Sequence, residues 1–130
     1  MSQILIPISP GDLLDKITIL EIKFERIESA EKKSNVKEEL KLLIKAWGDS
    51  EIGDTNLTTM RRQLKSINKV LWDIEDKIRK EENNKNFGDR FIELARSVYM
   101  KNDERAKIKR RINTHLNSEI VEEKSYQSYS

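Results

Sequence analysis

The sequence predicts an all-α fold, and three observations carry that prediction. Charged residues make up 37% of the 130 residues and hydrophobic residues only 36%. The chain has four glycines and two prolines, too few for the many turns of a β-sandwich or barrel. Apolar residues instead recur every three or four positions in four segments, as they do on amphipathic helices. We therefore expect an antiparallel four-helix bundle of long helical hairpins, with roughly 65–75% helix, about twice the average of soluble proteins.

A chain of this length is expected to form one domain over residues 1–130, with the helical bundle in residues 10–118. Residues 1–9 are expected to form a short extended arm, because Pro7 interrupts a β-branched apolar run. Residues 119–130 are expected to form a tail that first docks and then frays.

The first helix has a clear start signal. Ser9 is in the N-cap position, Pro10 occupies the first helical position, and Asp12 follows three residues after the cap. We expect the helix to run from about residue 10 to about residue 31. Its apolar stripe has 4-3-4-3 spacing and consists of Leu13, Ile17, Leu20, Phe24 and Ile27.

The second helix is expected to begin after residues 32–34, where Asn35 and Glu38 form a capping pair. It should end at Gly48, and a polar loop over residues 48–55 should follow. Its apolar stripe consists of Val36, Leu40, Leu43 and Trp47.

The third helix carries the most regular pattern in the chain. Its a and d heptad positions are apolar without a miss: Leu57, Met60, Leu64, Ile67, Leu71, Ile74 and Ile78. This is the pattern of a coiled-coil seam over about three heptads. Trp72 lies next to the seam, a position that suits a helix–helix contact or the edge of a dimer interface.

The fourth helix is expected over about residues 89–117, apolar at its start and basic in residues 101–111. After it, Ile120 and Val121 are expected to dock on the bundle. The basic run could follow a phosphate backbone, but two acidic residues interrupt it and no aromatic residues interleave to stack bases. Nucleic-acid binding is therefore not favoured as a function.

The composition limits the classes of binding partner and the cellular compartment that we expect for this protein. The net charge is only +2, from 25 basic and 23 acidic residues, so no general field attracts nucleic acid or a membrane surface. The chain has no cysteine, which excludes disulfides and thiol chemistry. No signal-peptide pattern and no long apolar window are present, so we expect a cytoplasmic protein without membrane attachment.

The sequence offers no pattern for a metal or a cofactor. His115 is the only histidine and has no second ligand at metal-binding spacing. The acids Asp73, Glu75 and Asp76 each precede a base by four residues, which is typical of a solvated helix face. We therefore expect no metal and no cofactor, and no catalytic residue can be named.

One charged side chain falls on the inward face of the fourth helix. Extending its stripe from Leu94 and Val98 leads to Arg105 in either phase, and a buried guanidinium must be paired. Two interpretations stay open: an ion pair, for example with Asp15 or Glu21 of the first helix, which we favour, and an anion pocket between helices. The candidate site consists of Arg105, Asn102, Lys109, Asp15, Lys16 and Glu21.

Several segments along the chain carry a resemblance: residues 9–23 (SPGDLLDKITILEIK), 71–79 (LWDIEDKIR), 91–99 (FIELARSVY), and 102–113 leading into 119–126. They cover about half of the chain. They resemble a small bacterial family of uncharacterised helical proteins, a domain-of-unknown-function family. The resemblance implies a helical fold, and it implies no activity, substrate or catalytic residue.

These patterns favour a non-catalytic helical interaction or scaffold protein that self-associates as a homodimer, because long thin stripes need more cover than one short chain provides. The first alternative is a small all-α enzyme or anion-binding protein with an Arg-lined pocket between helices, by analogy with chorismate-mutase-like bundles. The second alternative is weak nucleic-acid binding through the basic part of the fourth helix.

Overall fold

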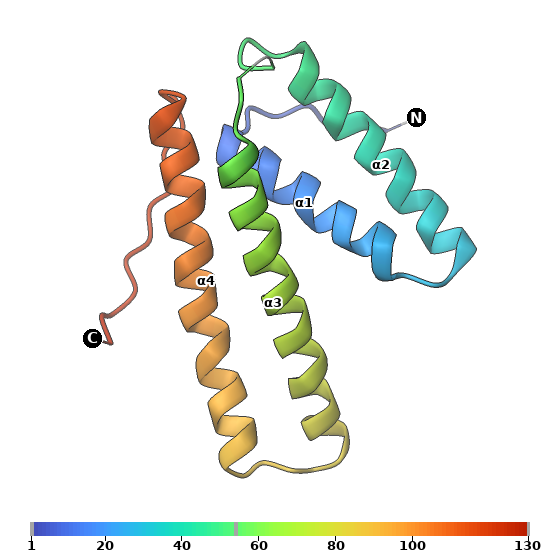
Figure 1. Ribbon diagram of the computed structural model, residues 1–130, viewed down its shortest axis with the longest axis vertical. Coiled ribbons are helices and arrows are strands. Elements are labelled where there is room, and N and C mark those ends of the chain that lie inside the picture. Colours follow the sequence, from blue (N-terminus) through green and yellow to red (C-terminus); the bar gives the residue numbers. More distant parts are fainter. Residues whose placement is uncertain (1, 54, 130) are drawn as a thin grey trace.

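The computed structural model describes residues 2–53 and 55–129, and this part of the chain forms four helices and no strand. Residues 1, 54 and 130, which fall in the expected arm, loop and tail, lie outside the described residues. The helices are α1 (Pro10–Arg26), α2 (Ala30–Asp49), α3 (Thr58–Asn83) and α4 (Asp89–His115) (Figure 1). The described residues are 71% helical, so the predicted all-α fold is confirmed.

The long antiparallel hairpin of α3 and α4 is the largest part of the fold (Figure 1). α1 lies across one end of this hairpin and contacts both of its helices. Among the described residues, α2 packs against no helix but α1, although its Trp47 side chain reaches the core. Of the first two helices in the described part of the chain, α1 alone packs on both helices of the hairpin, and the distal half of the hairpin projects beyond α1 and α2 (Figure 1).

The break between α1 and α2 lies earlier than the sequence pattern indicated. α1 ends at Arg26 instead of residue 31, because Ile27 adopts extended backbone angles. Ser29 then caps α2, and its Oγ accepts a hydrogen bond from the backbone N–H of Lys32 at 3.4 Å. With that cap in place, Asn35 lies inside α2 and is not its N-cap.

The core lies where α1 crosses the hairpin. Its central cluster consists of Leu14, Leu57, Leu64, Ile67, Ile108 and Ile112. Five of the seven seam positions of the third helix are buried, and they pack against α4 and α1 of the same chain. Trp72, expected at a helix–helix contact or at a dimer edge, lies under the guanidinium of Arg26 of α1, at 5.8 Å from the ring centroid. The seam is thus largely covered within one chain.

A glycine allows α1 to approach α4 closely. The backbone N–H of Gly11 donates to Asn113 Oδ1 at 2.7 Å. A Cβ at this position would lie 2.6 Å from the backbone oxygen of Lys109. Only glycine therefore fits this approach without a shift of backbone atoms.

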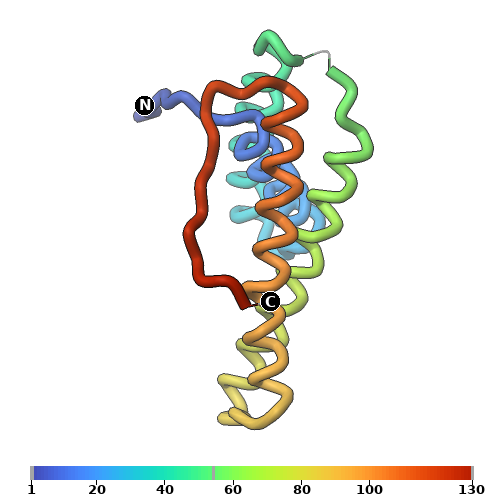
Figure 2. Tube along the Cα trace, turned by 90° about the vertical axis from the view of Figure 1, so that its left-hand side faces the viewer, coloured from blue at the N-terminus to red at the C-terminus, as the bar shows by residue number. Residues whose placement is uncertain are grey.

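The tail runs back along α4 (Figure 2). Its contacts are polar and aromatic: Glu122 pairs with Lys109 at 3.0 Å, and the ring of Tyr129 meets Tyr99 edge-on at 5.3 Å between centroids. Ile120 and Val121 remain exposed, so the expectation that these two residues dock is wrong. Charge and ring contacts hold the tail instead of apolar burial.

Candidate functional site

A buried carboxylate joins three helices where α1 crosses the hairpin. Asp15 of α1 is only 3% exposed. Arg105 of α4 donates to it twice, from Nε to Oδ1 at 3.0 Å and from Nη2 to Oδ2 at 2.5 Å. Asn68 of α3 donates from Nδ2 to Oδ1 at 2.9 Å. Two of the three donors belong to one planar guanidinium, and this group commonly binds a carboxylate through two parallel hydrogen bonds.

Neighbouring side chains complete this network. Thr18, one turn after Asp15, accepts from Asn68 Nδ2 at 3.1 Å and donates to the backbone oxygen of Asp15 at 2.9 Å. Asn102, one turn before Arg105, accepts from Arg105 Nη1 at 3.3 Å. Both helices therefore supply their polar groups at i,i+3 spacing, on the faces that meet. The network pairs the buried carboxylate of Asp15 with the half-buried guanidinium of Arg105, as burial of a charge requires.

The candidate residues fall into three groups. Arg105, Asp15 and Asn102 lie in one network, with Arg105 on one of the two acids that the sequence indicated. Lys109 lies one turn further along α4 and binds Asp12 at 2.7 Å and Glu122. The remaining two lie apart from Arg105: Glu21 pairs with Arg61 at 2.8 Å, and Lys16 is exposed.

Sequence reasoning missed Asn68 and Thr18, which complete the network. Asn68 directly follows Ile67 on the apolar seam, at a heptad position that faces the neighbouring helix. An amide at such a position, opposite an inward guanidinium, was a signal that could have found it. Thr18 gave no such signal, because threonine also occurs on helix faces that bind nothing.

The Lys109 cluster ties the start of α1 and the tail to α4. Burial alone would raise the pKa of Asp12, but hydrogen bonds from Lys109 and Ser9 and the charges of Lys109 and Lys16 outweigh it, so this pKa is lowered. Burial alone would lower the pKa of Lys109, and the hydrogen bonds and charges of its acidic partners raise it instead. Both shifts favour the charged pair in the folded state.

Lys109→Met is expected to lower the free energy of unfolding by about 1–2 kcal/mol at pH 7. The lowered pKa of Asp12 contributes stability that is present above about pH 4 and is lost as pH falls through the folded-state pKa. The raised pKa of Lys109 contributes stability that is present below about pH 10 and is lost as pH rises through its folded-state pKa. Urea unfolding from pH 2 to pH 11 should therefore show the two proteins converging at both extremes.

Lys45→Met is the matched control for this pair. Lys45 and Asp49 also pair, at 2.5 Å, but both side chains are more than 60% exposed. This control should leave the stability within measurement error at every pH. A Lys109→Met variant as stable as the control at pH 7 would contradict the role given to this cluster.

A groove lies beside Arg105, with a volume of about 380 Å³. Its walls come from α1, α3 and α4: Ile19, Ile22, Asn68, Leu71, Trp72, Glu75, Asp76, Asn102 and Arg105. Arg105 already binds Asp15, and the carboxylates of Asp76 and of Glu75, which pairs with Arg79 at 3.6 Å, line the same groove. An anion in the groove would meet these carboxylates, and the geometry therefore disfavours the anion-pocket interpretation.

The basic run of α4 is largely paired. Besides Arg105 and Lys109, Lys101 pairs with Glu104 at 3.4 Å and Arg110 with Glu123 of the tail at 3.6 Å. These acids reduce the local positive field that would attract a phosphate backbone. In residues 2–53 and 55–129, no three carboxylate or histidine side chains group as a metal site would require, and no helix could span a membrane.

The chain belongs to a family of unknown function, described as "Family of unknown function (DUF6165)", whose model matches residues 4–129. No curated protein and no solved structure matches the chain. The resemblance seen in the sequence to a family without assigned function is thereby confirmed.

Proposed function

We propose that this protein is a non-catalytic helical interaction module that self-associates as a homodimer. Its exposed surface is the observation that carries the proposal. The chain exposes 9701 Å². A compact monomer of 15.3 kDa would expose only about 7,100 Å². The difference is about 2,600 Å², and each partner in a stable homodimer buries about 1,000–2,500 Å².

The shape of the molecule explains the excess area. The hairpin projects beyond α1 and α2, and α2 has a single helical neighbour among the described residues (Figure 1). Large apolar side chains are exposed on four parts of the chain: on the arm, on α2, along the hairpin and on the tail. Surface of this kind is characteristic of proteins that bind another protein.

The closed polar network supports the same proposal. The alternative, an anion site lined by Arg105, needs the donors of this guanidinium to be free to face a pocket. Arg105 instead has one side of its guanidinium on Asp15 and a further donor on Asn102. The network is best understood as a device that fixes how α1 crosses the hairpin, since buried ion pairs set register in other helical proteins.

Light scattering coupled to size exclusion tests self-association. At micromolar concentration the protein should have a mass of about 30 kDa, twice the 15.3 kDa of one chain. The mass should fall toward that of one chain on dilution, as mass action requires. A sharp species of one-chain mass that persists at concentrations above about 100 μM would overturn the proposal.

A further inference from the structure

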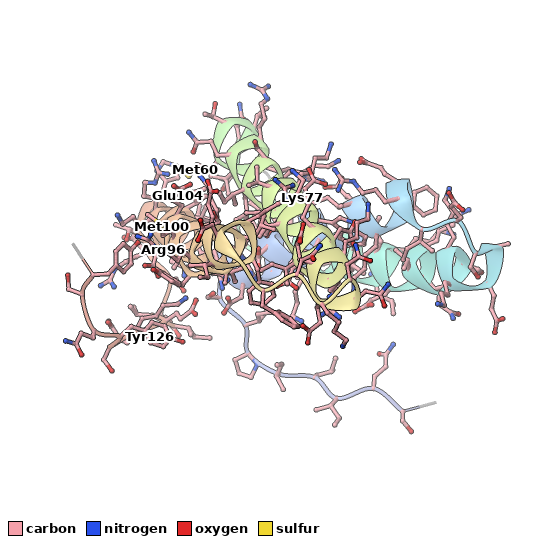
Figure 3. All side chains as sticks on the ribbon, turned by 90° about the horizontal axis from the view of Figure 1, so that it is seen from below. Met60, Lys77, Arg96, Met100, Glu104 and Tyr126 are labelled. Carbon is pink, nitrogen blue, oxygen red and sulfur yellow. The ribbon has the colours of Figure 1, made fainter. Side chains whose placement is uncertain are left out.

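The N-terminal arm is the most exposed apolar segment of the chain. Ile4, Leu5 and Ile6 are 88%, 90% and 68% exposed. Residues 2–8 carry no charge, in a chain whose residues are 37% charged. Figure 1 shows the arm leaving α1 on the α2 side and passing behind α2, and Figure 3 shows that it extends away from the helices. A soluble protein gains by covering such a segment.

The base of the arm is firmly held. Ser9 is 1% exposed, and its Oγ accepts from the backbone N–H of Asp12 at 3.1 Å. Two residues later, Gly11 binds Asn113 of α4. The arm therefore leaves the body at a fixed point, and little freedom is lost at its base when its end binds a partner.

The second half of α2 has an apolar face wider than its neighbour covers. Six of the eight residues from Leu40 to Trp47 are apolar. At 100° per residue, Leu40, Leu43 and Trp47 form the half-buried stripe, whereas Leu42 and Ala46 lie one turn apart beside it and are exposed. Ile44, on the other flank of the stripe, is exposed as well. α1 is the only helix near this surface among the described residues.

We propose that the arm of each protomer lies across the second half of α2 of a second copy, so that two such contacts form around a two-fold axis. This inference rests on the proposed self-association and specifies its interface. A two-fold dimer contains every contact twice, so one arm and one α2 face per chain are sufficient. The arm binds another copy because it lies apart from its own α2 (Figure 3).

The arm and the second half of α2 match in length and in charge. Six extended residues of the arm span about 20 Å, and the eight helical residues 40–47 span about 12 Å, so the arm can cross the whole apolar half of α2. Charged groups lose hydration energy if an uncharged segment covers them, and residues 40–47 hold only two charges, Lys41 and Lys45. Lysine stems can also lie along a bound chain while their ammonium groups stay in water.

The test uses one substitution on each surface. Leu5→Asp alters the arm and Leu42→Asp alters α2; both side chains are exposed, so neither change should unfold the protein. Ile92→Asp, at a 53% exposed site on the hairpin, is the matched control. Because each change acts twice in a two-fold dimer, we expect the dimer Kd to rise at least about 100-fold for Leu5→Asp and Leu42→Asp, with no change for Ile92→Asp.

Mixing the two variants gives the sharper result. A dimer of one Leu5→Asp chain and one Leu42→Asp chain retains one intact contact, between the arm of the second and α2 of the first. Native mass spectrometry with one chain labelled with ¹⁵N should show this mixed dimer at a Kd between those of wild type and either variant. A chain with both substitutions should form no mixed dimer with wild type, since both contacts are then altered.

The outcomes separate this inference from the proposed function. If wild type dimerises and Leu5→Asp dimerises equally well, the arm contact is overturned and self-association stands. If Leu42→Asp alone persists as a dimer, the arms bind each other or another surface, and the α2 contact is overturned. If wild type is a monomer whose melting temperature falls with both substitutions, the arm covers its own α2, and both proposals are overturned.

Discussion

Arg105→Ala is expected to lower the free energy of unfolding by about 3–5 kcal/mol, because it leaves the buried carboxylate of Asp15 without its charged partner. In the part of the chain that the structure describes, Asn68 would remain as the only side-chain donor to that carboxylate, at 2.9 Å. A single amide does not compensate a buried charge. Urea unfolding of wild type and variant at pH 7 measures the difference.

Two further variants show whether the loss comes from this pair. Arg110→Ala removes an arginine from the same helix, but its side chain is 61% exposed, so a change of no more than about 0.5 kcal/mol is expected. Asp15→Asn combined with Arg105→Ala removes the stranded charge, and it should recover at least about 1 kcal/mol of the loss.

Ligand addition distinguishes the ion pair from an anion site. Because Arg105 is paired within the chain, inorganic phosphate and simple dicarboxylates should leave the melting temperature of wild type unchanged. A rise in the melting temperature with either anion, together with a stable Arg105→Ala variant, would instead support the anion-binding alternative. If Arg105→Ala changed neither stability nor ligand response, the structural role given to Arg105 would be wrong.

Periodicity revealed the inward position of Arg105 because a helix face repeats in a fixed register. The stripe through Leu94 and Val98 meets residue 105 in either phase. What stayed open was whether an acid of the chain or a bound anion lies opposite, and which acid it would be. That choice between Asp15 and Glu21 depends on how α1 crosses the hairpin. A crossing angle is set by contacts along both helices, and it cannot be deduced from the pattern of one.

The first helix boundary was misplaced because two caps compete within a short stretch. Ser29 and Asn35 are both good N-cap residues, and residues 30–34 have ordinary helix propensity. Local preference therefore does not decide between them. The extended conformation of Ile27 decides it, because it ends α1 and lets α2 begin after Ser29, with Trp47 packed against the core.

The sequence pattern did not reveal, for a related reason, that α2 packs against a single helix among the described residues. The stripe of α2 predicts that the helix has one covered face, and it has one, against α1. The sequence contains no count of neighbours, so a helix with one partner and a helix with three carry similar stripes. The extra apolar residues Leu42 and Ile44 are the sign that more cover is needed, and they are the basis of the proposed arm contact.

Gly11→Ala is expected to destabilise the protein by about 1–3 kcal/mol, the range for a methyl group forced into a filled space. The added Cβ would lie 2.6 Å from the backbone oxygen of Lys109 and 2.9 Å from Asn113 Oδ1. A backbone oxygen cannot rotate away as a side chain can. The start of α1 must therefore move off α4, and the hydrogen bond from Gly11 to Asn113 is lost with it.

Gly48→Ala is the matched control, and the expected change in stability has the opposite sign. Gly48 lies in the last turn of α2, and a Cβ there meets nothing within 4 Å. Alanine should therefore stabilise this helix by up to about 0.5–1 kcal/mol. Thermal and urea unfolding of both variants measure the two effects, and equal shifts would show that glycine flexibility alone governs both positions.

Because Gly11 also fixes the base of the arm, Gly11→Ala should weaken self-association, whereas Gly48→Ala should leave it unchanged.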